Sequence, residues 1–255
     1  MHKMDFNCYC GNWPFFRIRY NTAEKLAQLH SRCGITGGFV SSCEAIFYQD
    51  PYEAEVLLSK ELEGTPYMHA LTLNPMLPAW KDDLTRATKE LNIRAVRLMP
   101  GFHNYSLTDP VLTQVCDALR TYGLPLILTL RIRDERTAWM FSPNSVPLDE
   151  LSAFLDSNRD ITTLLACTRC AEVLRLEAQF NCRDNLFTDI SGFKDGNFAV
   201  RDAVRAVGAA HIVYGSSAPL LEMQSTTIMV ERVGLPENTQ KDIFAGTQLM
   251  QLLNR

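Results

Sequence analysis

The chain has 255 residues, of which 46% are hydrophobic and 21% are charged. This composition supports a large buried core and excludes a disordered, collagen-like or disulfide-scaffold protein. The formal net charge is -4, from 25 basic and 29 acidic residues, and no long basic block occurs. We therefore expect no nucleic-acid partner and no anionic membrane partner.

Two further features concern the cellular compartment. No apolar run approaches the ~20 residues of a membrane span, and the N-terminus lacks the apolar core of a signal peptide. The eight cysteines are few for this length, and most stand in apolar segments where buried free thiols are common. We expect a cytoplasmic protein with reduced cysteines.

Short apolar segments alternate with amphipathic segments along the whole chain. The predicted strands are 4–9, 36–41, 67–73, 93–99, 125–129, 161–166, 186–190 and 211–215. The predicted helices lie near 22–33, 51–62, 80–91, 110–122, 148–157, 170–180, 197–207 and 219–232, with a final helix at about 238–253. This alternation is typical of repeated β-α units around a parallel sheet.

Helix start and stop residues stand where this alternation requires them. Asp50-Pro51 precedes a helical segment, as an N-cap followed by a first-turn proline does, whereas Gly34 and Gly123 follow helical segments. Eight β-α units predict an α/β fold, a (β/α)8 TIM barrel, as one domain over residues 1–255. A doubly wound open sheet is the alternative, which is weakened because no Gly-x-Gly-x-x-Gly follows a strand and no Walker lysine motif occurs.

Four short motifs add a resemblance to a known family. They are Asp5 with Gly11 around the first strand, 98–101 (Leu-Met-Pro-Gly) after the fourth, 124–125 (Leu-Pro) at the fifth, and 215–216 (Gly-Ser) with Pro219 after the eighth. With them the chain resembles, almost end to end, the amidohydrolase-related family of TIM-barrel metal-dependent hydrolases. That family includes lactonases of dicarboxylates and aromatic-acid decarboxylases. The resemblance implies an active site at the carboxyl ends of the strands.

The resemblance also implies five metal-ligand positions, and each holds a different residue here. The two histidines of the first strand correspond to Asn7 and Tyr9, the histidines of the fifth and sixth strands correspond to Thr129 and Cys167, and the aspartate of the eighth corresponds to Ser217. Zinc binds cysteine, histidine or carboxylate, so only Cys167 remains an ordinary ligand. We therefore predict no cofactor, although the family carries zinc or another divalent metal.

The alternative to a metal-free site at the carboxyl ends of the strands is a new metal site built from cysteine thiolates. Cys8 and Cys10 form a Cys-x-Cys pair, and Cys167 and Cys170 form a Cys-x-x-Cys pair, which are spacings that metal sites use. However, the two-residue period of a strand places Cys8 and Cys10 on the face opposite to Asn7 and Tyr9, which are expected to point into the barrel. Buried thiols are therefore the favoured interpretation.

Arginines follow several of the predicted strands. Arg97 ends the fourth strand, Arg131 and Arg133 follow the fifth, and Arg169 follows the sixth. Guanidinium groups suit bidentate binding of a carboxylate or phosphate, so we predict a small polar or anionic ligand. The predicted ligand-binding residues are Asn7, Arg97, Thr129, Arg131, Cys167, Arg169 and Ser217. For Arg97, the alternative is a buried ion pair with Asp5 or Asp189.

Tyr9, Asp189 and His103 are the candidate catalytic residues. Each stands near a strand end and can take part in acid-base chemistry. Each also has a structural alternative: a satisfied core hydroxyl for Tyr9, an ion pair for Asp189 and an exposed loop position for His103. For Ser217, the alternative is to cap the helix that follows it.

Three functional hypotheses remain at this point. The first is an amidohydrolase-like barrel without its metal that binds a small carboxylate-bearing molecule and has lost hydrolysis. The second is an active metal-independent hydrolase, lactonase or decarboxylase of a small carboxylated substrate. The third is a non-catalytic partner of an active hydrolase, with the barrel as scaffold. A homo-oligomer is compatible with each of them.

Overall fold

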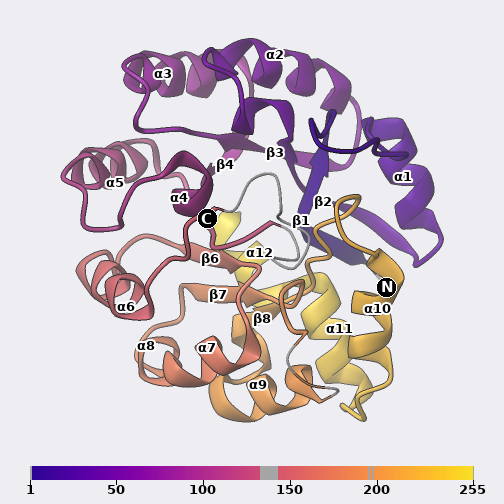
Figure 1. Ribbon diagram of the computed structural model, residues 1–255. Coiled ribbons are helices and arrows are strands. Elements are labelled where there is room, and N and C mark those ends of the chain that lie inside the picture. Colours follow the sequence, from indigo (N-terminus) through magenta and orange to yellow (C-terminus); the bar gives the residue numbers. More distant parts are fainter. Residues whose placement is uncertain (1, 133–142, 195, 197, 255) are drawn as a thin grey trace.

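The computed structural model describes residues 2–132, 143–194, 196 and 198–254. Eight strands form one parallel sheet in the order β1 to β8, and Figure 1 shows them arranged around a common axis with helices outside. The strands are β1 Lys3–Cys10, β2 Ile35–Ser42, β3 Tyr67–Thr72, β4 Ile93–Leu98, β5 Leu126–Thr129, β6 Thr163–Ala166, β7 Leu186–Asp189 and β8 Ile212–Val213. All eight coincide with predicted strands.

The sheet closes between its first and last strands. Phe6 N donates to Tyr214 O at 2.9 Å, Tyr9 N donates to Ala218 O at 2.8 Å, and an isolated parallel bridge joins Cys8 to Ala218. Closure of a parallel sheet on itself gives the barrel that the alternation predicts. The chain is thus a single (β/α)8 barrel, and the open-sheet alternative is wrong.

The helices follow the strands in sequence, and most of them cover the outside of the barrel (Figure 1). They are α1 Ala23–Ser31, α2 Pro51–Leu62, α3 Trp80–Glu90, α4 Pro100–His103, α5 Val111–Tyr122, α6 Leu148–Ser157, α7 Cys170–Arg175, α8 Glu177–Asn181, α9 Ala199–Val207, α10 Met223–Glu231, α11 Glu237–Ala245 and α12 Thr247–Leu253; single 3-10 turns span Glu44–Ile46 and Ala209–His211. Pro51 occupies the first turn of α2 and Gly123 ends α5 at φ +64°, as the helix start and stop residues predict. No described helix is long and apolar enough to cross a membrane.

Two predicted helices are each divided in the structure. The segment 170–180 breaks at Leu176 into α7 and α8, and the segment 238–253 breaks at Gly246 into α11 and α12. Gly246 has φ +56°, and a Cβ there would lie 2.3 Å from the Phe6 ring. The turn at Gly246 therefore needs glycine for both its conformation and its packing, and it places α12 across one end of the barrel.

The barrel interior is apolar at the amino-terminal ends of the strands. Phe6, Phe39 and Phe187 fill it together with smaller side chains from the other strands, and Leu249 of α12 packs against them. Figure 1 shows α12 near the barrel axis. This plug closes the amino-terminal ends of the strands, so the polar interior is confined to their carboxyl ends.

Strand β1 contains an irregularity that decides which side chains face inward. Its pairing with β2 shifts between Asp5 and Cys8. As a result Phe6 packs in the barrel interior, whereas Asp5 lies 3.2 Å from His30 of α1, outside the barrel. The alternative of an Arg97–Asp5 ion pair is therefore wrong, because Asp5 points out of the barrel whereas Arg97 points into it.

The cysteines follow the expectation of buried or free thiols. All eight are free of disulfides. Cys8 and Cys10 pack in the apolar layer between the barrel and its helices, on the face of β1 opposite to Asn7 and Tyr9. Cys167 lies in the barrel interior instead, 3.5 Å from Asn7 Nδ2, so these cysteines do not gather into one thiolate site.

Candidate functional site

Arg97 crosses the barrel interior near the carboxyl ends of the strands. Its side chain is fully buried, and Nε donates to Ser41 Oγ at 2.7 Å. Nη1 lies 2.8 Å from Asn7 Oδ1, 2.9 Å from Tyr9 Oη and 2.8 Å from Thr129 Oγ1. Among the described residues no carboxylate pairs with Arg97, and its Nη2 has no hydrogen-bond partner. The guanidinium is therefore held by neutral groups and keeps one nitrogen for a further acceptor.

Asn7 connects this guanidinium to the opposite wall of the barrel. Its Oδ1 accepts from Arg97, while its Nδ2 donates to Asp189 Oδ2 at 2.6 Å and to Ser217 Oγ at 2.8 Å. The amide thus stands between the cation and the carboxylate. Asp189 balances the charge of Arg97 through Asn7, whereas the sequence had suggested a direct ion pair as the alternative.

Four donor groups hold the Asp189 carboxylate. Oδ1 accepts from Cys167 N at 2.9 Å and from Ser191 N at 3.1 Å, and Ser191 Oγ lies within 3.0 Å of both oxygens; Asn7 supplies the fourth donor. Burial nevertheless raises the pKa of Asp189 from 3.8 to about 6, because the cost of removing the carboxylate from water exceeds what these donors return. Asp189 can therefore exchange a proton near neutral pH.

Cys167 and Ser217 meet in this network with unusual backbone angles. Their φ angles are +57° and +55°, and Cys167 Sγ lies 3.0 Å from both Ser217 Oγ and Ser191 Oγ. A left-handed conformation is strained for residues other than glycine, and such strain concentrates at functional sites. These turns at the ends of β6 and β8 point both side chains at Asn7. The helix-cap alternative for Ser217 is wrong, because α10 begins at Met223 with Glu222 as its N-cap.

An aromatic cluster lies beside the polar network on the same end of the barrel. Trp13 and Phe47 follow β1 and β2, and Phe102 lies in α4 after β4. The Trp13 ring centroid is 5.1 Å from that of Phe47 and 6.2 Å from that of Phe102. Tyr9 belongs to the same cluster, and its hydroxyl contacts Arg97. A planar apolar group on this cluster would thus lie next to the guanidinium.

The remaining predicted site residues lie apart from this network or are engaged elsewhere. Arg131 binds Glu172 through both terminal nitrogens, at 2.8 and 2.7 Å, so its guanidinium already has a bidentate carboxylate. Arg169 is exposed at the start of α7, and its backbone N donates to Glu172 Oε2 at 2.8 Å. Arg131 Nη1 also donates to Cys167 O at 3.0 Å, at the edge of the network. The predicted ligand-binding roles of Arg131 and Arg169 stay predictions. Arg133 lies outside the described residues.

His103 is half-buried rather than exposed. Its Nε2 donates to Ile46 O at 3.0 Å, and its ring stacks against Tyr105. Burial lowers the pKa of His103 to about 4, so the imidazole is neutral at neutral pH. Its described contacts are structural, and the predicted catalytic role remains a prediction.

The predicted site residues did not include two polar members of the network. Ser41 accepts from Arg97, and Ser191 holds Asp189. Both stand at strand ends, at the last position of β2's predicted segment and directly after the predicted seventh strand. Their position at strand ends was the available signal, because the barrel brings those ends together.

The five positions that the sequence resemblance aligned with metal ligands converge, but their residues do not fit a divalent metal. Asn7, Tyr9 and Thr129 turn their oxygens toward Arg97 Nη1, and Cys167 and Ser217 turn toward Asn7 Nδ2. Neutral amide and hydroxyl oxygens are poor zinc ligands, and burial raises the pKa of the Cys167 thiol, which disfavours the thiolate. A guanidinium among the ligands would also repel the ion.

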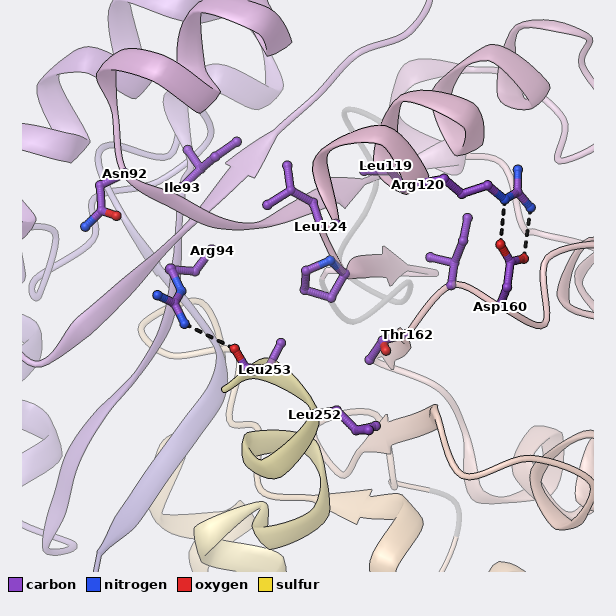
Figure 2. Close-up of a pocket in the computed structure, with 13 residues that line it drawn as sticks. Asn92, Ile93, Arg94, Leu119, Arg120, Leu124, Asp160, Thr162, Leu252 and Leu253 are labelled. Carbon is purple, nitrogen blue, oxygen red and sulfur yellow. Dashed lines mark hydrogen bonds and ion pairs between the residues drawn. The ribbon is translucent and has the colours of Figure 1, made fainter. Parts of the chain in front are cut away.

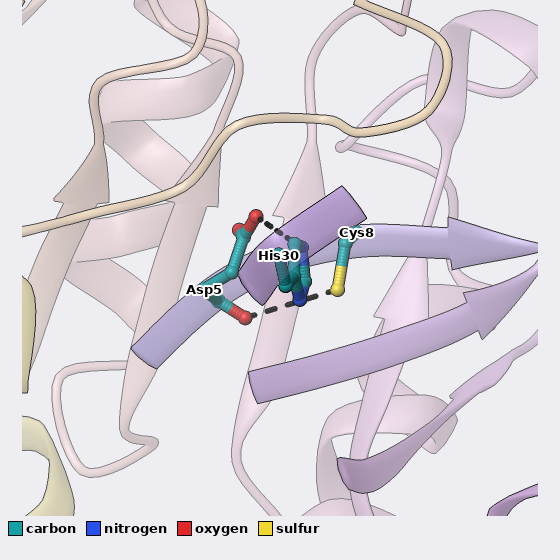
Figure 3. Close-up of side chains that lie close together, drawn as sticks. All are labelled: Asp5, Cys8 and His30. Atoms are coloured by element: carbon teal, nitrogen blue, oxygen red, sulfur yellow. Dashed lines mark hydrogen bonds and ion pairs between the residues drawn. The ribbon is translucent and has the colours of Figure 1, made fainter. Parts of the chain in front are cut away.

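A second group of metal-ligand types lies outside the barrel. Asp5, Cys8 and His30 are buried, and their ligand atoms lie within 4.8 Å of one another (Figure 3). Each already has a protein partner: Asp5 accepts from Ser216 N at 3.0 Å, Cys8 Sγ donates to Phe39 O at 3.1 Å, and His30 Nδ1 lies 2.9 Å from Tyr67 Oη. This group joins β1 to α1 and to the segment after β8, which supports barrel closure rather than metal binding.

A cavity of about 610 Å³ opens at the other end of the barrel. Figure 2 shows Arg94 reaching Leu253 of α12, and Arg120 paired with Asp160, around this cavity. Its lining comes from the amino-terminal ends of β4 to β6 and from α12. In TIM barrels that end contributes to stability, so the Arg97 end is the candidate functional site.

No known family model and no curated protein matches this chain. Solved structures share its fold. A 2,6-dihydroxybenzoate decarboxylase from Rhizobium has a TM-score of 0.72 at 13% identity, covering 100% of this chain and 99% of that one. A dihydroxybenzoic acid decarboxylase from Polaromonas sp. JS666, with bound manganese and 2-nitroresorcinol, has a TM-score of 0.73 at 14% identity, covering 100% and 98%. A 5-carboxyvanillate decarboxylase from Sphingomonas paucimobilis has a TM-score of 0.69 at 15% identity, covering 91% and 82%. At these identities the likeness establishes the TIM-barrel fold.

Proposed function

We propose that this barrel binds a small carboxylate-bearing molecule at the carboxyl ends of its strands, without a divalent metal, and that Arg97 binds the carboxylate. One observation carries the proposal: Arg97 is a fully buried cation whose described partners are neutral, and its Nη2 is unpartnered. Removing a guanidinium from water is costly unless each of its donors finds an acceptor. A ligand carboxylate would supply the missing acceptor as a charge-assisted hydrogen bond.

The aromatic cluster favours an aromatic acid over an aliphatic one. Trp13, Phe47 and Phe102 belong to one cluster with Tyr9, and the Tyr9 ring centroid lies 4.8 Å from Arg97 Cζ. Proteins of the same fold act on dihydroxybenzoates, which combine a planar ring with a carboxylate. We therefore take benzoate and 2,6-dihydroxybenzoate as the first ligands to test.

The test compares Arg97→Met with Arg94→Met, a control at the other end of the same strand. Binding of benzoate and of neutral benzamide is measured by calorimetry on folded protein. We expect the wild type and Arg94→Met to bind benzoate but not benzamide. Arg97→Met should lose about 1.5–3 kcal/mol of binding free energy, the size of a hydrogen bond to a charged group. Unchanged affinity of folded Arg97→Met would refute the proposed role of Arg97.

Metal-independent decarboxylation is the second candidate function. Asp189 favours it, because a buried carboxyl with a pKa of about 6 can protonate a ring carbon when carbon dioxide leaves. Turnover of 2,6-dihydroxybenzoate in the presence of a chelator, followed as carbon dioxide release, tests it. Activity that persists with chelator and disappears in Asp189→Asn supports this candidate. The absence of both binding and turnover would favour the scaffold hypothesis instead.

A further inference from the structure

The environment of Arg97 resembles the solvation shell of a cation. Three oxygens, from Asn7, Tyr9 and Thr129, lie within 2.9 Å of a single nitrogen, Nη1. That nitrogen carries only two hydrogens, so it has one more oxygen neighbour than it has hydrogens to donate. All three oxygens belong to neutral groups with available lone pairs. Their convergence indicates a cage that stabilises positive charge.

The charge of the cage is matched to a monovalent ion. Asp189 is the carboxylate joined to it, through Asn7, while Ser41 adds a neutral oxygen at Nε. A divalent ion would retain a net positive charge in a buried site with one remote carboxylate, which is unfavourable. A guanidinium matches the arrangement of these oxygens, because its Nε contacts Ser41 Oγ while its Nη1 contacts the other three.

We infer that the oxygens of Ser41, Asn7, Tyr9 and Thr129 form a binding site for a guanidinium-type cation, which the Arg97 side chain fills in the native protein and a free alkylguanidinium can fill once that side chain is removed. The inference depends on the contacts of Nε and Nη1. The proposed carboxylate binding depends on Nη2. Either can therefore fail while the other holds.

Chemical rescue of Arg97→Ala tests this inference. Ethylguanidinium is the fragment that this substitution deletes, and its binding is followed by the thermal unfolding midpoint at low millimolar concentrations. Arg94→Ala, which deletes the same fragment from an exposed arginine, is the matched control. We expect ethylguanidinium to raise the midpoint of Arg97→Ala in a saturable manner by about 2–4 °C, the size typical of a modest ligand for a chain of this length. The control should show no saturable rise.

Two outcomes would overturn the inference. One is the absence of a saturable response in folded Arg97→Ala. The other is a larger stabilisation of Arg97→Ala by Mn²⁺ or Zn²⁺ than by ethylguanidinium, since that would make the cage a divalent-metal site. If Arg97→Ala does not fold, Arg97→Lys is compared with Arg97→Met. A cage for positive charge makes the lysine variant the more stable of the two, and an equal or lower stability contradicts it.

Discussion

Asp189 should make the stability of the folded barrel decrease as pH rises from about 4 to 6. Burial raises its pKa from 3.8 to about 6. A group whose folded pKa lies above its unfolded pKa contributes stability that is complete below the unfolded value. That contribution is lost as pH rises through the folded value. Most carboxylates that form ion pairs act in the opposite direction.

The magnitude follows from the size of the shift. A difference of about two pKa units corresponds to about 3 kcal/mol, at 1.36 kcal/mol per unit. This free energy applies in full, because Asp189 is fully buried and water does not screen its charge. The loss should be spread between about pH 4 and pH 6 and should be complete at pH 7.

Urea unfolding of the wild type and of Asp189→Asn, from pH 4 to pH 7, measures this contribution. Asp189→Asn removes the titration, and although it disturbs the hydrogen bond with Asn7, that cost does not vary with pH. The free-energy difference between the two proteins should therefore shift by about 3 kcal/mol across this range, in favour of the variant at higher pH. Asp160→Asn is the control, because Arg120 lowers the pKa of exposed Asp160 and its loss should not reproduce this shift. A difference that stays constant from pH 4 to pH 7 would show that Asp189 is not perturbed by burial.

Three further predictions concern the same end of the barrel. Gly215→Ala should destabilise the protein by about 1–3 kcal/mol in urea unfolding, because the added Cβ would lie 2.7 Å from Asp189 Cβ and Oδ2; wild-type stability would contradict this packing. Iodoacetamide at pH 8 should label exposed Cys182 but leave Cys167 protected, as mass spectrometry can show, because Cys167 is buried and its thiol pKa is raised; equal labelling would show an open site. Benzoate affinity should increase between pH 7 and pH 5, because protonation of buried Asp189 removes a negative charge from the network that holds Arg97; calorimetry showing weaker binding at pH 5 would contradict the charge balance.

The sequence alone predicted the barrel and much of its interior. The alternation of β and α segments predicted all eight strands, because apolar β-branched runs between capped helices leave few other topologies. The two-residue period of β1 placed Asn7 and Tyr9 together on the inner face, and both contact Arg97 there. The prediction that Thr129 joins them followed from its position at a strand end, since closure brings such ends together.

Only the tertiary structure decided which charges meet. A register shift in β1 turns Asp5 outward to His30, and a one-position shift of that kind cannot be read from alternation. Glu172, from a helix after β6, accepts hydrogen bonds from Arg131. Arg97 instead donates to neutral oxygens from three other strands. These partners are distant in sequence, and local patterns specify where each side chain points without specifying what it meets. The unpartnered Arg97 Nη2, on which the proposed function rests, is therefore a property of the assembled barrel.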